Sequence, residues 1–251
     1  MKNILQLSKV IRGWVLALVA SWDNEAKIRF LMKKYWPGFK DLVFVQTRWD
    51  SMFIADCGDR IAFGMDGTRS SWAWISNFMA WNKDGFPRGM KASLDGLFDD
   101  IYERTVFDFA SCYARNRFEG GGQSRAGGGI AYLNYRFRLK GYKVETFGFN
   151  PMFNCYSDGY EKMRKAGVCH TYFPVEPFSS LPADPVDNMK PKKGRHYGHR
   201  EVLLSSAGPF SHSYQVTNGL LQDWMREEPR RNIFKEDADF LADLGHDIIK
   251  K

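Results

Sequence analysis

Residues 120–129 read Gly-Gly-Gly-Gln-Ser-Arg-Ala-Gly-Gly-Gly, and this stretch decides how the rest of the chain is interpreted. Glycine-rich turns that open a helix have two common uses. They hold a phosphate at the helix N-terminus, or they force a nucleophile into a sharp turn after a strand. A phosphate loop requires a lysine after its last glycine, and none follows here; a dinucleotide fingerprint requires a third glycine where Arg125 stands. Both phosphate-binding interpretations are therefore disfavoured.

The same stretch satisfies the pattern of a nucleophile turn, which places small residues two positions before and two positions after a serine. Gly122 and Ala126 stand at these positions around Ser124. The pattern predicts that Ser124 is a nucleophile held at the start of a helix, in an elbow that also contains Gln123. The elements and motifs around the elbow indicate what chemistry such a serine would perform.

Strand-like and helical patterns alternate along the chain, which predicts an α/β fold with a mostly parallel central sheet and helices on both faces. We expect a single domain over residues 1–251, with N-terminal helices within residues 1–40 and an apolar, buried or lid-like segment at residues 69–88. Residues 115–120 make a poor strand, so the strand before the elbow is expected to be short or at an edge. Strands are predicted at residues 42–45, 51–55, 60–63, 87–93, 142–147, 168–173 and 201–204. Helices are predicted at residues 4–20, 23–35, 72–81, 94–114, 130–139, 157–165, 212–226 and 235–249.

Composition excludes several classes of protein. The formal net charge is +7, but the basic residues form only two mild clusters, near the N-terminus and at residues 190–200, which is typical of solvated surface. No nucleic-acid-binding motif is present, and contact with an anionic membrane surface is a weak alternative. The four cysteines form no C-x-x-C pair, which indicates free thiols in a reducing compartment and no metal site or cofactor.

The N-terminal apolar run, residues 14–20, is short for a signal peptide and fits an amphipathic helix better. No stretch approaches the roughly 20 apolar residues that a membrane-spanning helix needs. A cytoplasmic location is therefore expected.

Six stretches, in chain order, resemble motifs of the class 3 (fungal-type) lipases, a family of α/β-hydrolases. The third contains the elbow, and the fourth, with Thr146-Phe147-Gly148, resembles the strand that follows the elbow in that family. The stretches are residues 61–68, 71–77, 123–128, 141–151, 175–182 and 211–214.

The resemblance implies a catalytic triad in the chain order serine, acid, histidine. Ser124 would be the nucleophile, His212 the general base and Glu176 the acid that orients the histidine. Asp184 and Asp187 lie close to Glu176 in the sequence and are alternative acids. His199, which precedes a predicted strand, is a weaker alternative to His212.

The resemblance also implies an oxyanion hole made by the backbone N–H groups of Thr68 and Arg125, with the Thr68 hydroxyl as a further donor. The substrate would then be a carboxylic ester, lipid or lipid-like, cleaved without a cofactor.

Four residues depart from the family's pattern at the expected site. Asp66 replaces an arginine, Gln123 a histidine, Ala126 a glycine and Glu176 an aspartate. Two hypotheses therefore stay open: an active serine esterase or lipase, and a hydrolase-like protein that has lost catalysis and binds instead.

Overall fold

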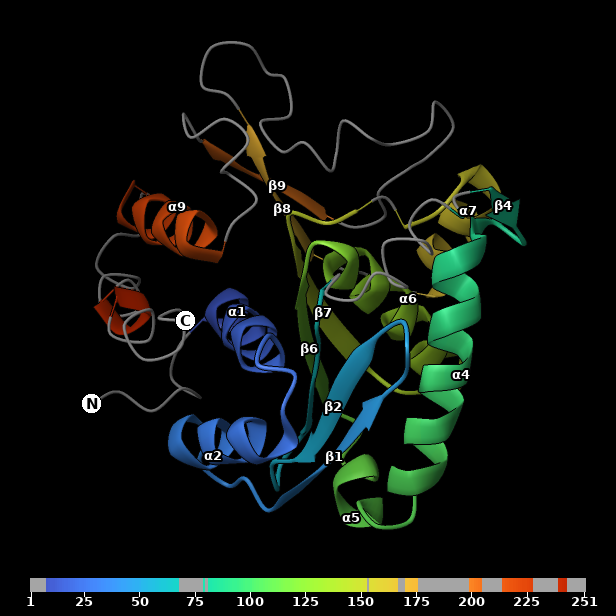
Figure 1. Ribbon diagram of the computed structural model, residues 1–251, viewed down its shortest axis with the longest axis horizontal. Helices are drawn as coiled ribbons and strands as arrows, with labels where there is room; N and C mark the ends of the chain where they lie inside the picture. Colours follow the sequence, from blue (N-terminus) through green and yellow to red (C-terminus); the bar gives the residue numbers. More distant parts are fainter. Residues whose placement is uncertain are drawn as a thin grey trace.

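The computed structural model describes most of the chain as helices around one sheet (Figure 1). The described residues are 8–67, 79, 81–152, 154–166, 170–175, 199–204, 214–227 and 239–242. The helices are α1 (Lys9–Ala20), α2 (Glu25–Tyr35), α4 (Arg88–Thr105), α5 (Ala110–Tyr113), α6 (Arg125–Leu139), α7 (Ser157–Ala166) and α9 (Tyr214–Glu227). The strands are β1 (Asp41–Gln46), β2 (Ser51–Asp56), β3 (Ile61–Met65), β4 (Asn82–Lys83), β5 (Phe86–Pro87), β6 (Phe118–Gln123), β7 (Val144–Phe149), β8 (His170–Val175) and β9 (His199–Leu204).

The central sheet has the strand order β1-β2-β3-β6-β7-β8-β9. The pairs β1–β2 and β2–β3 are antiparallel, and every pair from β3 to β9 is parallel. Because parallel strands end at the same edge, the carboxyl ends of β3, β6, β7, β8 and β9 lie together. Strand β6, which leads into the elbow, is in the middle of the sheet rather than at an edge, contrary to the prediction from residues 115–120.

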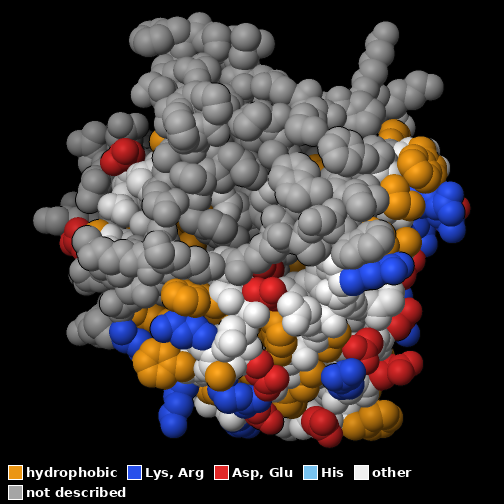
Figure 2. All heavy atoms as spheres, viewed as in Figure 1, with side chains coloured by type: hydrophobic (Ala, Val, Ile, Leu, Met, Phe, Trp, Pro, Cys, Tyr) orange, Lys and Arg blue, Asp and Glu red, His pale blue; other side chains and the backbone are white. Residues whose placement is uncertain are grey.

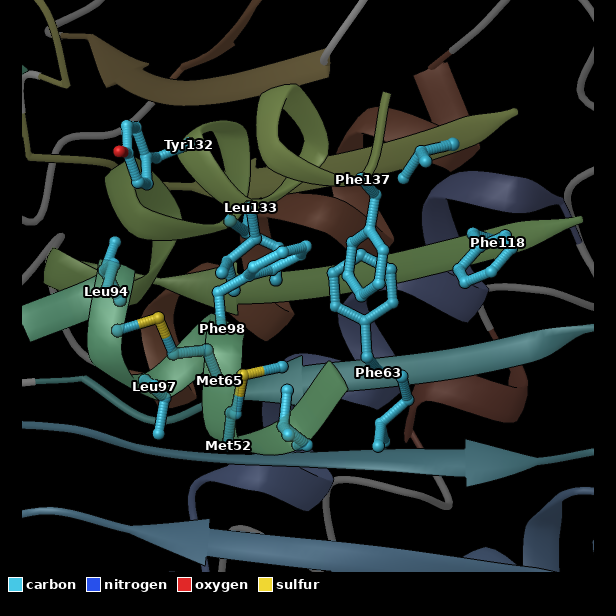
Figure 3. Close-up of a cluster of buried hydrophobic side chains, with 14 of the residues drawn as sticks. Met52, Phe63, Met65, Leu94, Leu97, Phe98, Phe118, Tyr132, Leu133 and Phe137 are labelled. Carbon is cyan, nitrogen blue, oxygen red and sulfur yellow. The ribbon is translucent and has the colours of Figure 1, made fainter. Parts of the chain in front are cut away.

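Helices cover both faces of the sheet, as predicted (Figure 1). One hydrophobic core joins α1, α2 and α9 to one face. The other joins α4 and α6 to the opposite face, and its interdigitated side chains are drawn in Figure 3. Rings from strands β3 and β6 meet rings from α4 and α6 there, with Phe98 and Phe137 edge to face at 4.8 Å. Edge-to-face pairs add to the stabilisation that apolar burial provides.

Glycines place β6 at the centre of the sheet although its sequence is a poor strand. A Cβ on Gly121 would lie 1.8 Å from the carbonyl oxygen of Gly13 in α1, and a Cβ on Gly120 would lie 2.5 Å from the ring of Phe63. Glycine within a strand often marks such a close approach of another backbone. The prediction was wrong because it weighed strand propensity alone and not packing against the strand.

Three further predictions of local structure were wrong. Residues 87–93 do not form a strand: only Phe86–Pro87 does, as part of the short β4–β5 hairpin, and α4 begins at Arg88. The predicted helix over residues 94–114 is interrupted, since α4 ends at Thr105 and α5 spans Ala110–Tyr113.

The N-terminal helix is not amphipathic, because every residue of α1 from Val10 to Ala20 is buried. A helix that is buried all round belongs to a protein interior.

The described surface mixes both signs of charge. Figure 2 shows Lys and Arg side chains interspersed with Asp and Glu side chains over the described part of one face. None of the described helices is long and apolar enough to cross a bilayer. Within the segment 69–88, the β4–β5 hairpin is described, and the helix predicted at residues 72–81 lies almost entirely outside the described residues.

Candidate active site

Ser124 occupies the single residue between the end of β6 and the start of α6. Its backbone has φ 61° and ψ −129°, a conformation that residues with a side chain rarely adopt. Three backbone hydrogen bonds hold it: its N–H donates to the Phe149 carbonyl (3.0 Å), and its carbonyl accepts from the N–H groups of Gly128 (3.2 Å) and Met152 (3.0 Å). Strain of this kind persists only where the surroundings fix it, and it is concentrated at functional sites. The side chain is half-buried, so its hydroxyl is not sealed in the core.

The residues on either side of Ser124 must be small, as the motif predicted. A Cβ on Gly122 would lie 2.6 Å from the carbonyl oxygen of Ala126 and 3.1 Å from its Cβ. Ala126 itself is fully buried. On α6, a Cβ on Gly128 would lie 2.5 Å from the Met152 carbonyl. The turn is therefore tight enough to present a serine at the carboxyl edge, which is the geometry of a nucleophile elbow.

Arg125, the residue after the nucleophile, makes a buried ion pair with Asp50. Its Nε donates to Oδ1 of Asp50 at 2.7 Å and its second terminal nitrogen donates to Oδ2 at 2.9 Å. The two side chains are only 1% and 0% exposed. Ser93 of α4 donates a third hydrogen bond to the same carboxylate. Because a two-pronged guanidinium–carboxylate contact fixes both position and orientation, this pair holds the first residue of α6 in place.

Asp50 was not predicted, and no local pattern marks it. It lies in the turn between β1 and β2, where the Thr47 N–H donates to its carbonyl at 2.9 Å. Its partner is 75 positions further along the chain. Only the tertiary fold brings the two together.

The segment after β3 lies against the elbow. A Cβ on Gly67 would be 3.4 Å from the Gln123 carbonyl and 3.7 Å from the Cβ of Ser124. Before it, the buried Asp66 accepts the Gly67 N–H at 2.8 Å through Oδ1. Asp66 therefore places a carboxylate beside the turn where the family has an arginine. Thr68 follows directly and lies outside the described residues, so its part in an oxyanion hole stays a prediction.

Helix α9 is tied to the elbow by a side-chain hydrogen-bond network. Oγ1 of Thr217 accepts from the Asn150 amide at 2.7 Å and from the Gln123 amide at 3.5 Å. Thr217 and Asn150 are fully buried, and Gln123 is nearly so. Asn150 directly follows β7 and Gln123 directly precedes Ser124. The network therefore fixes the first turn of α9 next to the carboxyl ends of the two central strands.

The predicted base, His212, and the predicted acid, Glu176, are close in sequence to α9 and β8, which the structure brings to the carboxyl edge of the sheet. Helix α9 begins at Tyr214, two positions after His212, and β8 ends at Val175, one position before Glu176. His212, Glu176, Asp184 and Asp187 themselves lie outside the described residues. Their roles therefore remain predictions.

His199 is disfavoured by strand register. It is the first residue of β9 and lies opposite His170, which lies opposite Phe147 of β7. Strand β9 is three strands from β6 in the sheet order, which at about 4.8 Å per strand separates the two backbones by about 14 Å.

The described cysteines offer no rival nucleophile to Ser124. Cys57, Cys112 and Cys155 are buried thiols rather than disulfide partners, as predicted for thiols in the core. Burial raises the pKa of the Cys57 thiol well above its usual range and that of Cys112 to about 11, so neither is a ready thiolate. Among the described residues, no group of three or more His, Cys, Asp or Glu side chains could hold a metal ion.

The structure resembles those of fungal lipases. A triacylglycerol lipase from Penicillium expansum matches with a TM-score of 0.58 at 14% identity, covering 83% of this chain and 84% of that one. A mono- and diacylglycerol lipase from Aspergillus oryzae matches with a TM-score of 0.59 at 13% identity, covering 76% and 77%. Lipase II from Rhizopus niveus matches with a TM-score of 0.59 at 10% identity, covering 83% and 84%. No protein-family model and no curated protein sequence matches the chain.

The chain therefore has the α/β-hydrolase fold. More particularly, the chain has the form of that fold found in fungal triacylglycerol lipases. The resemblance to class 3 lipases is therefore confirmed at the level of the fold.

Proposed function

We propose that the protein is a serine hydrolase that cleaves carboxylic esters through an acyl-enzyme formed on Ser124. The observation that carries this proposal is the backbone of Ser124, strained at φ 61° between a central parallel strand and a helix. A sheet needs no such strained residue for its own stability. The strained turn exposes the Ser124 hydroxyl at the carboxyl edge, where α/β folds bind their ligands.

In the proposed reaction, Oγ of Ser124 attacks the ester carbonyl carbon while His212 takes the hydroxyl proton. The tetrahedral oxyanion accepts hydrogen bonds from the backbone N–H groups of Arg125 and Thr68, each worth about 3 kcal/mol of transition-state stabilisation. His212 then returns its proton to the departing alcohol, and water, activated by the same histidine, releases the acid. Glu176 orients His212 and stabilises its cation.

We propose a lipid or lipid-like ester as the substrate. One similar structure is a triacylglycerol lipase, a second is a mono- and diacylglycerol lipase, and a third is lipase II. These names support a substrate with an apolar acyl chain. Contact with a membrane or lipid surface would deliver such a substrate. The reaction uses no cofactor.

One observation favours the alternative, a hydrolase-like binding protein. The buried carboxylate of Asp66 accepts the Gly67 N–H beside the elbow. A negative charge close to a developing oxyanion raises its energy. If this effect prevails, the elbow is retained without turnover.

Labelling with a fluorophosphonate, followed by intact-mass measurement, distinguishes an active serine hydrolase from a hydrolase-like binding protein. The wild type should gain one adduct at neutral pH, and Ser124→Ala should gain none. Ser157→Ala, which removes an exposed serine at the start of α7, is the matched control and should label like the wild type. An unlabelled wild type would overturn the hydrolase proposal.

Kinetic comparison then assigns the other roles. His212→Ala should abolish labelling. Among Glu176→Gln, Asp184→Asn and Asp187→Asn, the variant with the largest loss of kcat identifies the acid. A series of p-nitrophenyl esters from acetate to palmitate tests the lipid assignment, which predicts kcat/KM rising with acyl length. A preference for acetate would contradict it.

A further inference from the structure

A cavity of about 500 Å³ opens at the end of the sheet opposite the elbow. Its lining includes the amino ends of β6 and β7, at Phe118 and Val144, and the first turns of α1. Glu119 lies in this lining and five positions before Ser124, which along a strand is about 16 Å. The cavity is therefore separate from the candidate active site.

The cavity is lined by many more cations than carboxylates. Its basic residues come from three sources: the residues directly before adjacent strands, helix α1 on one face, and the end of α6 on the other. A cation directly precedes each of β3, β6 and β7, which are neighbours in the sheet. The basic residues are Lys9, Arg12, Arg60, Arg117, Arg138 and Lys143, and the acidic residues in the lining are Glu119 and Glu145.

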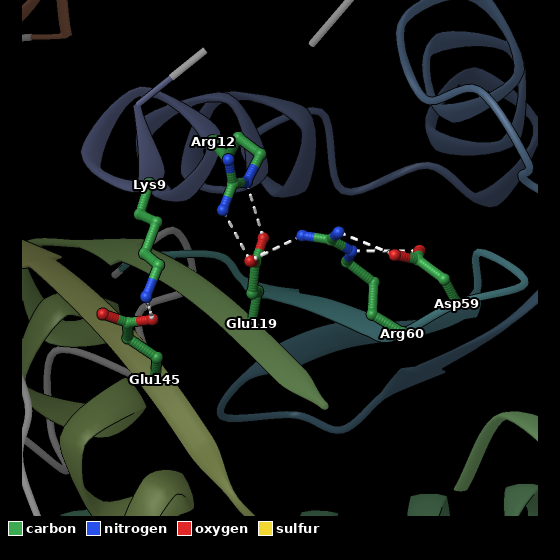
Figure 4. A network of polar contacts seen from close by, with 6 residues as sticks. All are labelled: Lys9, Arg12, Asp59, Arg60, Glu119 and Glu145. Carbon is green, nitrogen blue, oxygen red and sulfur yellow. Dashed lines mark hydrogen bonds and ion pairs between the residues drawn. The ribbon is translucent and has the colours of Figure 1, made fainter. Parts of the chain in front are cut away.

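Part of this charge is neutralised within the wall (Figure 4). Glu119, nearly buried, accepts two hydrogen bonds from Arg12 at 2.8 and 2.7 Å and a third from Arg60 at 2.7 Å. Arg60 also pairs with Asp59 at 2.7 Å, and Lys9 pairs with Glu145 at 2.7 Å. These six groups balance to zero net charge and make a fixed wall.

Three cations remain. Arg117 and Lys143 make no direct ion pair in the described part of the chain, and both are exposed. Asp59, which pairs directly with Arg60, also interacts electrostatically with Arg117. Arg138 is half-buried, and within the described ranges it donates only to neutral acceptors, namely the Asn134 amide oxygen at 2.9 Å, the Ala166 carbonyl at 3.3 Å and the Val144 carbonyl. Its guanidinium is thus held in position with its charge uncompensated. A cavity lined by one sign of charge concentrates counter-ions of the other sign.

We propose that this cavity binds a ligand carrying linked phosphate groups. Three cations without a direct carboxylate partner, two of them guanidinium groups suited to phosphate oxygens, match the roughly three negative charges of a diphosphate near neutral pH. The volume lies within the range of small-ligand sites. The proposal does not depend on the hydrolase activity of Ser124.

Calorimetric titration with inorganic pyrophosphate at low ionic strength tests it. The wild type should bind pyrophosphate more tightly than inorganic phosphate, and Arg117→Gln/Lys143→Gln should weaken binding by roughly tenfold or more. Neither side chain makes a direct ion pair in the described part of the chain, and Asp59 keeps Arg60 as its partner, so the substitutions leave no described acid unpaired. Lys33→Gln/Lys83→Gln removes two exposed charges elsewhere and should bind like the wild type.

A second experiment, binding to lipid vesicles, identifies whether the phosphate groups belong to a lipid or to a soluble compound. Binding to vesicles containing cardiolipin, whose headgroup joins two phosphates through a glycerol, that pyrophosphate competes away would assign the cavity to a lipid headgroup. Pyrophosphate binding without vesicle binding would assign it to a soluble phosphate compound. Absence of pyrophosphate binding by the folded wild type, or an equal loss in both double variants, would overturn the proposal.

Discussion

The guanidinium of Arg125 and the carboxylate of Asp50 form a two-pronged ion pair that is almost completely excluded from solvent, directly behind the nucleophile elbow. Burying two charges is costly, and a buried pair repays that cost only when its geometry is good and its remaining hydrogen bonds are made. Here Ser93 supplies the additional donor. The pair ties the β1–β2 turn, α4 and the start of α6 to one another.

Replacing Asp50 by asparagine should destabilise the protein by about 3–5 kcal/mol, because Arg125 is left buried without its counter-charge. Under the proposed function kcat should also fall, since the Arg125 N–H would move relative to the oxyanion. Urea unfolding and ester hydrolysis measure the two effects. Asp100→Asn breaks the exposed pair with Arg104 and should cost less than about 1 kcal/mol. Equal losses in the two variants would show that the buried pair has no special role.

Gly121→Ala should destabilise the protein strongly. The added Cβ would fall 1.8 Å from a backbone oxygen of α1, and overpacking of this kind costs at least about 1–3 kcal/mol. Gly96→Ala in α4 is the control, since a Cβ there meets nothing within 4 Å. It should stabilise the protein by about 0.5–1 kcal/mol through helix propensity. A neutral Gly121→Ala would contradict the close approach of α1 to β6.

Asp95 should make stability depend on pH in the acid range. Burial alone would raise its pKa, but the hydrogen bond from Lys91 at 2.7 Å, that from Tyr132 at 2.6 Å and the Arg136 charge together lower it. A pKa that is lower in the folded state adds stability above the unfolded value, near 3.8, and this stability is lost as pH falls through the folded value.

The thermal midpoint of Asp95→Asn should therefore fall less between neutral and acid pH than that of the wild type. Asp108→Asn, at an exposed carboxylate, should follow the wild-type curve. Parallel curves for wild type and Asp95→Asn would refute the assignment.

Thr217→Val should reduce turnover as well as stability. It removes the acceptor of the buried Asn150 amide and so loosens α9 next to the elbow, at a cost of about 1–3 kcal/mol. Thr105→Val removes a buried hydroxyl that bonds Ile101 and Tyr113 at 2.7 Å, far from the elbow. Both variants should lose stability, but only Thr217→Val should lower kcat at a temperature where both are folded. An equal loss of kcat would mean that the network serves stability alone.

Local patterns were sufficient for most of the sheet. The strands near residues 42–45, 51–55 and 60–63 and that at 142–147 were predicted within two residues of β1, β2, β3 and β7, because apolar runs between turn signals are unambiguous there. The position of Ser124 between a strand and a helix was also predicted, since only small residues fit on either side.

What sequence reasoning missed depends on contacts between distant residues. Strand β6 is central because α1 packs on Gly121 and Phe63 packs on Gly120, and no local pattern contains that information. Asp50 and Thr217 reach the elbow from 75 and 94 positions away. The cations before β3, β6 and β7 are visible in the sequence, but their convergence requires the order of the strands.

The packing of α1 on β6 also constrains how the chain is made. Arg12 and its partner Glu119 are 107 positions apart, so a helix buried on every side leaves the ribosome long before the strand that covers it. At about 5–20 residues per second, this apolar helix is unprotected for about 5–20 seconds during synthesis. Holding chaperones should therefore bind the nascent chain through α1, and release it once β6 has emerged and the sheet can close over the helix.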